Sequence, residues 1–114
     1  MSAITTHVLD TALGRPASGV PIELERQAAG GAWERLSSGR TDADGRLRTL
    51  LPQDAPLAVG TYRISFDTAA YFAAVGQAVF YPEVRVVFAV SEPGGHLHVP
   101  LLLSPFGYST YRGS

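Results

Sequence analysis

The chain of 114 residues contains no cysteine and no lysine, and it is poor in charge. The absence of cysteine excludes disulfide bonds, thiolate nucleophiles and zinc sites built on thiolates, although it does not fix a compartment. Charged residues make up 17% of the chain, against ~25% in typical soluble domains. All nine basic residues are arginine, ten residues are acidic, and neither sign forms a block. This balance argues against nucleic acid or an anionic membrane as a partner.

Long hydrophobic runs are also missing, since no stretch approaches the ~20 apolar residues of a membrane-spanning helix. The first residues lack a basic segment followed by an apolar one, because Thr5, Thr6, His7 and Asp10 interrupt it. We therefore expect a cytoplasmic protein with no membrane partner.

Short segments of alternating apolar and polar residues, separated by glycine, proline and aspartate, are typical of β-strands. We expect strands over residues 4–10, 20–26, 33–38, 46–50, 60–67, 84–90 and 96–104, and a last one after the turn at 104–107. One helix is expected over 67–76, with Asp67 or Thr68 as its cap and Gly76 at its end. The pattern predicts an all-β, two-sheet antiparallel sandwich of seven to eight strands with one short helix, forming a single domain over residues 1–114.

The final strand pair is unusual because leucine occurs on both faces of its first strand. One face carries Val99, Leu101 and Leu103, and the other carries His96, His98, Pro100 and Leu102. A single sandwich core needs only one apolar face, so we expect a second copy of the chain to cover the other. That arrangement would bring His98 to a subunit interface, and the low charge of the chain agrees with self-association.

Histidine is the side chain whose ordinary pKa lies nearest neutrality, so His7 and His98 are the first candidates for chemistry. Each shares a strand face with leucine, and taken singly each is better explained as a hydrogen-bonded residue at a packed interface. A catalytic role becomes the better explanation when the two histidines are taken together with Arg46, which follows an Asp-Gly turn, and with the polar C-terminus. Two imidazoles and a guanidinium suit general-base activation of water against a polarised carbonyl.

A zinc site is the first metal alternative, because His96 and His98 share a strand face and His7 could be a third ligand. Nothing in their spacing requires a metal, and no carboxylate is positioned to complete the site. We therefore expect no metal.

The segment Asp42-Ala43-Asp44-Gly45 resembles part of a calcium loop. Arg40 occupies the first ligand position of such a loop and Leu51 the twelfth, and neither side chain binds calcium. A hairpin turn is the expected structure here.

Three segments together carry a family resemblance: residues 4–11, residues 41–46 and residues 98–114. With them the chain resembles the 5-hydroxyisourate hydrolases, the transthyretin-related enzymes of urate breakdown. The resemblance covers the whole chain, and its most specific part is the C-terminal Tyr-Arg-Gly-Ser. The departures are minor, such as Leu97 and Phe106 where a tyrosine is common.

The resemblance implies a transthyretin-like sandwich of eight strands, assembled as a homotetramer (a dimer of dimers) with active sites in clefts of a central channel. It implies hydrolysis of 5-hydroxyisourate to 2-oxo-4-hydroxy-4-carboxy-5-ureidoimidazoline, with no cofactor. The catalytic residues carried over by motif are His7, Arg46, His98 and Ser114, and the substrate-binding residues are His7, Arg46 and Tyr111. Which histidine acts as the base stays open.

Two other classes of function remain as alternatives. A transthyretin-like carrier would hold an aromatic ligand in the same channel without chemistry, although it would have no use for two imidazoles and a guanidinium at an apolar channel mouth. A β-sandwich adaptor would use the second apolar face to bind another protein, and it could be monomeric alone.

Overall fold

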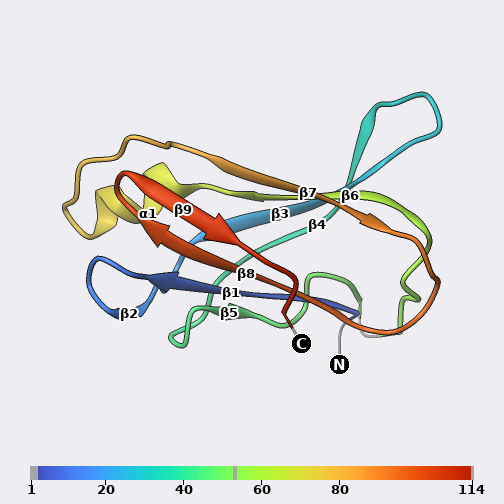
Figure 1. Ribbon diagram of the computed structural model, residues 1–114, viewed down its shortest axis with the longest axis horizontal. Helices are drawn as coiled ribbons and strands as arrows, with labels where there is room; N and C mark the ends of the chain where they lie inside the picture. Colours follow the sequence, from blue (N-terminus) through green and yellow to red (C-terminus); the bar gives the residue numbers. More distant parts are fainter. Residues whose placement is uncertain (1–2, 53, 114) are drawn as a thin grey trace.

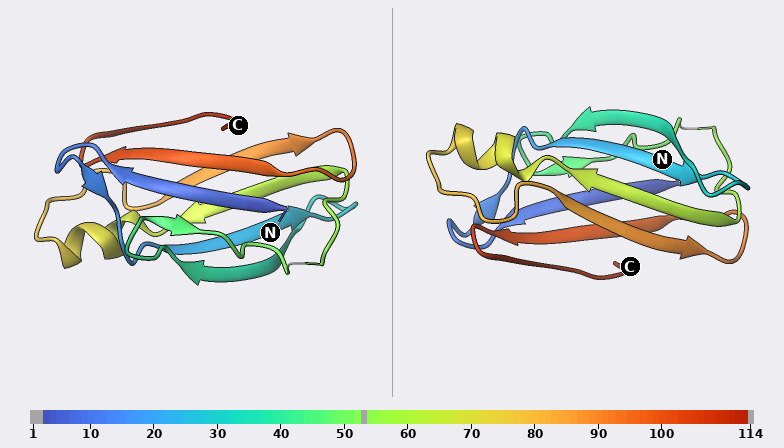
Figure 2. Two further views of the ribbon diagram at one scale, coloured as in Figure 1. Left: turned by 90° about the horizontal axis from the view of Figure 1, so that it is seen from below. Right: turned by 90° about the horizontal axis from the view of Figure 1, so that it is seen from above.

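The computed structural model describes residues 3–52 and 54–113 and places their strands in two stacked sheets (Figure 1). The five-stranded sheet contains β1 (Ile4–Asp10), β2 (Arg15–Pro16), β5 (Arg46–Leu47), β8 (Leu97–Ser104) and β9 (Gly107–Thr110). The four-stranded sheet contains β3 (Pro21–Gln27), β4 (Trp33–Arg40), β6 (Gly60–Phe66) and β7 (Val84–Val90). The helix α1 (Thr68–Ala74) lies at one end of the sandwich (Figure 2). The expected two-sheet β-sandwich with one short helix is confirmed.

The described residues form nine strands rather than the expected seven to eight, and β4 ends at Arg40 rather than at Ser38. The two-residue strand β2 lies in a segment expected to be only a turn, and β5 ends at Leu47 rather than at Leu50. Most strand pairs are antiparallel, but β1 and β8 run parallel, from Ile4 beside Leu97 to Asp10 beside Leu103. Alternation identifies strands and their faces, whereas pairing and direction depend on contacts between distant parts of the chain.

The core lies between the two sheets and is filled by the faces that alternation assigns to it. Val8 and Leu101 from one sheet and Leu24, Ile64 and Phe66 from the other are fully buried. Burial of each such side chain contributes ~1.5–3 kcal/mol. The opposite face of the β1–β8 pair is therefore free to carry polar side chains.

A buried hydrogen-bond cluster joins α1 to the end of β1. The Tyr71 hydroxyl donates to Oδ2 of Asp10 at 2.6 Å, and the main-chain N–H groups of Ala12 and Leu13 donate to Oδ1 at 3.0 and 2.9 Å. Burial first, and then the hydrogen bond and charge of Asp10, raise the pKa of Tyr71 to about 12. The phenol therefore stays protonated and acts as a donor.

Replacing Tyr71 with phenylalanine is expected to lower the free energy of unfolding by ~1–3 kcal/mol, because a buried oxygen of Asp10 loses its donor. Denaturant unfolding measures this change. Tyr108→Phe is the matched control, since Tyr108 is 44% exposed. Equal stability of the two variants would contradict the structural role of the Asp10–Tyr71 bond.

No helix among the described residues is long and apolar enough to cross a membrane.

Candidate active site

Strand β1 brings three of the residues expected at the site together on the outer face of the five-stranded sheet. His7 lies directly opposite Arg46 of β5, and Thr5 lies beside His98 of β8. Alternation turns Thr5, His7 and His98 away from the core, since their neighbours Val8 and Leu101 point into it. The side chains of His7, Arg46 and His98 are half-buried. This cluster, on three adjacent strands, is the candidate active site.

The turn before β5 fixes the position of Arg46. Oδ1 of Asp42 accepts hydrogen bonds from the main-chain N–H groups of Asp44 and Arg46, at 2.8 and 3.0 Å. The bond from the Arg46 N–H is the main cause that lowers the pKa of the Asp42 carboxyl. Gly45 has a φ of +75°, and a side chain there would meet the Val8 carbonyl. The same Gly45 accepts a hydrogen bond from the Val8 N–H at 2.7 Å, which ties the turn to β1.

The expectation of a hairpin at this turn is wrong. The turn connects β4 of one sheet to β5 of the other, and these two strands do not pair. The turn chemistry of Asp and Gly is local, and it does not specify whether the next strand pairs with the last one. Because β5 crosses to the other sheet, Arg46 reaches His7.

The hydrogen bond of His7 determines where its proton lies. Nε2 of His7 is 2.8 Å from the Asp44 carbonyl oxygen. A carbonyl oxygen only accepts, so Nε2 carries the proton and donates it. Neutral His7 therefore has its free lone pair on Nδ1.

His98 is held through its other ring nitrogen, Nδ1, rather than through Nε2. Its Nδ1 lies 2.8 Å from the hydroxyl of Thr5, while Nε2 has no hydrogen-bond partner among the described residues. Burial first, and then the charges of Arg46, His7 and His96, lower the pKa of His98, while a hydrogen bond with the Thr5 main chain opposes this shift without cancelling it. The imidazole is therefore neutral at physiological pH and has an unoccupied nitrogen.

The end of the chain returns to His98 after β9. The Gly113 N–H donates to the His98 carbonyl at 2.8 Å, and the two residues form an isolated antiparallel bridge. A Cβ atom at Gly113 would lie 2.7 Å from Cδ2 of the His98 ring. Only glycine allows the chain to pass this close to the imidazole. Ser114, expected to be catalytic, lies outside the described residues.

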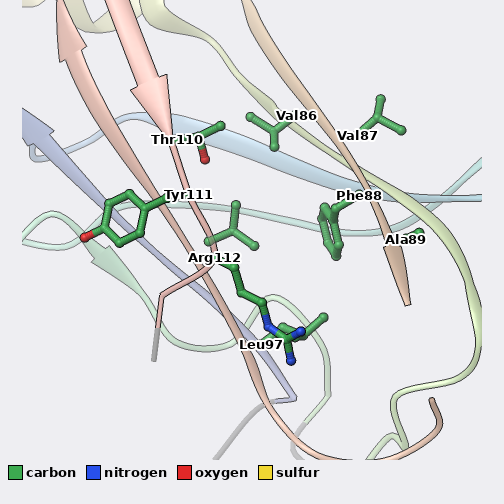
Figure 3. Close-up of a pocket in the computed structure, with 9 residues that line it drawn as sticks. Val86, Val87, Phe88, Ala89, Leu97, Thr110, Tyr111 and Arg112 are labelled. Atoms are coloured by element: carbon green, nitrogen blue, oxygen red, sulfur yellow. The ribbon is translucent and has the colours of Figure 1, made fainter. Parts of the chain in front are cut away.

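Tyr111 is the one described candidate that lies on none of the three strands of the cluster. Its side chain is 56% exposed, and no hydrogen bond or ring contact with His7, Arg46 or His98 exists in the described part of the chain. Figure 3 shows its ring directed away from Val87, whereas Arg112 extends towards Leu97. The substrate-binding role of Tyr111 stays a prediction.

The chain is similar to known proteins of one family. Residues 4–113 match the model of the HIUase/Transthyretin family. The chain belongs to this family. The 5-hydroxyisourate hydrolase of Caulobacter vibrioides is 49% identical over 118 residues, covering all of both chains. The mouse 5-hydroxyisourate hydrolase is 47% identical over 99% of this chain and 96% of its own. The resemblance expected from the sequence is confirmed.

Solved structures of the HIUase/Transthyretin family are similar along the whole fold. The 5-hydroxyisourate hydrolase of Klebsiella pneumoniae has a TM-score of 0.86 and 38% identity, covering 100% of both chains. Sea bream transthyretin in complex with thyroxine has a TM-score of 0.88 and 35% identity, covering 98% of this chain and 95% of its own. Because both structures fit about equally well, the fold alone does not separate a hydrolase from a carrier.

The zinc alternative has no support in the described residues. Histidine, aspartate and glutamate side chains there form no group of three that could hold a metal ion. His96 and His98 instead share one partner, the Thr5 hydroxyl. That the reaction needs no metal or cofactor stays a prediction.

Sequence reasoning missed two residues that hold His98, namely Thr5 and Gly113. Alternation places Thr5 on the same face of its strand as His7, but threonine is common in strands and gives no signal of its own. Gly113 belongs to the C-terminal segment, yet only the register of β8 with the end of the chain brings it against the imidazole.

Proposed function

We propose that the chain is a 5-hydroxyisourate hydrolase, which opens the six-membered ring of its substrate to give 2-oxo-4-hydroxy-4-carboxy-5-ureidoimidazoline. The relatives that carry this name match almost the whole chain. The observation that carries the proposal is the cluster of His7, Arg46 and His98 on one half-buried face. A neutral imidazole beside a guanidinium is suited to the hydrolysis of a ring amide.

In the proposed reaction, Nε2 of His98 takes a proton from water as the water oxygen attacks the ring carbonyl. The C–N bond then breaks, and the same proton passes from Nε2 to the leaving ring nitrogen. We assign the base to His98 because its Nε2 is unoccupied and its lowered pKa keeps the ring neutral at physiological pH. The ring of His7 is fixed by its bond to the Asp44 carbonyl, which suits it to orienting the substrate. His7 is proposed to orient the substrate through its ring.

Arg46 is proposed to bind the polar ring and to offset the negative charge that develops on the carbonyl oxygen. Charge stabilisation of this kind contributes ~10²–10³ in kcat. Tyr111 and Ser114 complete the proposal, Tyr111 by closing one side of the cleft and Ser114 by helping to place water or substrate. No metal or cofactor takes part in these steps.

The test of this function is to generate 5-hydroxyisourate in situ from urate and to follow the decay of its absorbance. The expected result is a decay that becomes faster in proportion to the protein added. A decay equal to that without protein, together with saturable binding of an aromatic ligand, would support the carrier instead.

The acid limb of the pH profile of kcat/KM reports the pKa of the base in the free enzyme. Because the pKa of His98 is lowered from 6.5, activity is expected to persist below pH 6.5 and to fall only when His98 is protonated. Arg46→Ala removes one cause of the lowering, so its acid limb is expected to shift to higher pH. Arg35→Ala is the control, since Arg35 pairs with Glu23 on the other sheet. If the acid limb of Arg46→Ala lies at the same pH as that of the wild type, the assignment of His98 as the base is contradicted.

The homotetramer is part of the same proposal, as is a cytoplasmic location. Strands β7 and β9 are edge strands of their sheets, and an apolar groove of about 240 Å³ lies between them, lined by Val86, Phe88, Leu97 and Val99 among others. Val87, on β7, is 56% exposed. Unpaired edges beside an apolar groove are suited to pairing with a second copy. Sedimentation of the wild type is expected to give the mass of four chains, and a monomer would contradict the tetramer.

A further inference from the structure

The hydroxyl of Thr5 lies between two imidazoles. Its Oγ1 is 2.8 Å from Nδ1 of His98 and 3.1 Å from Nε2 of His96. Thr5 is only 6% exposed, and no other side-chain partner of its hydroxyl exists among the described residues. His96 is exposed, whereas His98 is half-buried. The three side chains therefore form a chain of hydrogen bonds from solvent to the proposed base.

A hydroxyl has a single proton, so Thr5 can donate to only one of the two nitrogens. The other nitrogen must carry a proton of its own and donate it to Oγ1, because two facing lone pairs would repel each other. The tautomers of His96 and His98 are consequently coupled. Because the hydroxyl proton has no other partner among the described residues, Thr5 either donates to His96 and accepts from His98, or donates to His98 and accepts from His96.

These two arrangements have opposite consequences at Nε2 of His98. When Nδ1 donates to Thr5, the neutral ring has its lone pair on Nε2 and can accept a proton from water. When Nδ1 accepts from Thr5, the proton of the neutral ring is already on Nε2, and the ring cannot act as a base there.

We propose that Thr5 is a positioning residue, which holds the proton of His98 on Nδ1 by accepting it and by donating its own proton to Nε2 of His96. This inference rests on the proposed function, because only a base at Nε2 requires this tautomer. His96 acts as the acceptor that keeps the Thr5 proton away from His98. Neither Thr5 nor His96 touches the reacting atoms in this proposal.

The test combines turnover with the ¹⁵N shifts of the histidine rings, which distinguish a protonated nitrogen from an unprotonated one in alkaline buffer. In the wild type, Nδ1 of His98 is expected to be protonated. Thr5→Val is expected to move the proton towards Nε2 and to lower kcat ~10–100-fold with little change in KM, by analogy with the loss of a hydrogen bond that fixes the tautomer of a metal-bound imidazole. Thr5→Ser retains the hydroxyl and is expected to restore both readouts.

Two further variants keep the test decisive. Thr6→Val is the matched control, because the Thr6 hydroxyl donates to the Val99 carbonyl at 2.6 Å on the buried face of the same strand. Thr6→Val is expected to lower the free energy of unfolding while the proton of His98 stays on Nδ1. His96→Leu, at an exposed position, removes the acceptor and is expected to shift the tautomer even if Thr5→Val fails to fold.

The outcomes separate this inference from the proposed function. A wild-type His98 with its proton on Nε2, or a tautomer unchanged by Thr5→Val and by His96→Leu, would overturn the positioning role. A tautomer that shifts as expected in a protein without hydrolase activity would support the positioning role and overturn the proposed function alone.

Discussion

Replacing His98 with asparagine is expected to lower kcat by ~10²–10⁴-fold, the usual contribution of a general base. Asparagine keeps a hydrogen-bonding atom near the position of Nδ1, so the contact with Thr5 can persist. It has no atom at the position of Nε2, where the proposed base accepts the proton. KM is expected to change little, because the loss concerns the transition state rather than the binding of substrate.

The control for this variant is His7→Asn, measured with the same in situ substrate. Nε2 of His7 is engaged with the Asp44 carbonyl, so we expect this variant to raise KM as well as to lower kcat. Thermal unfolding and sedimentation are expected to match the wild type for both variants. A near-normal kcat in His98→Asn, combined with a large loss of kcat in His7→Asn, would show that His7 is the base rather than His98.

Much of the fold could be predicted because each long strand carries its own pattern. The fully buried residues of β6, Ile64 and Phe66, alternate with less buried ones as the sequence indicates. Local signals also give the helix, since Asp67 caps it by accepting from the Ala70 N–H at 3.0 Å. The short strand β2 could not be predicted in this way, because two residues are too few to show an alternation of apolar and polar side chains.

The pairing of strands is the part that local patterns leave undetermined. β1 and β8 are separated by most of the chain, and their parallel register results from packing rather than from a turn. The same holds for β5, which follows β4 in sequence but pairs with β1. His7 and Arg46 meet only because of this crossover, so their proximity could be expected from the family resemblance but not from residue spacing.

Thr5 illustrates a further limit. Its place on the face of His7 follows from alternation, but its two imidazole partners follow from the register of β1 with β8 and from the position of His96 just before β8. A common strand residue thus acquires specific partners, and the role proposed for it, through tertiary contacts. Sequence patterns propose the groups that carry the chemistry, and the structure shows which residues hold those groups in place.

Deletion of residues 112–114 is expected to abolish measurable hydrolysis, a loss of at least ~10²-fold, while the fold stays intact. The deletion removes Gly113, whose N–H donates to the His98 carbonyl and whose bare Cα packs against the imidazole. Strand β9 should survive, because its register with β8 ends at Thr110 and the Thr110 hydroxyl donates to the Pro100 carbonyl at 2.7 Å.

The matched variant is Gly113→Ala, which keeps the full length of the chain and the side chains of Arg112 and Ser114. Its Cβ would lie 2.7 Å from Cδ2 of His98 and 3.2 Å from the His98 carbonyl oxygen, so the chain end or the ring must move. A misplacement of ~1 Å in a catalytic group can cost ~10²-fold in rate. We therefore expect Gly113→Ala to lose most of its kcat with an unchanged thermal midpoint. If the truncated chain and Gly113→Ala both turn over at the wild-type rate, the contact between the chain end and His98 has no part in catalysis, and the site must be complete within residues 1–111.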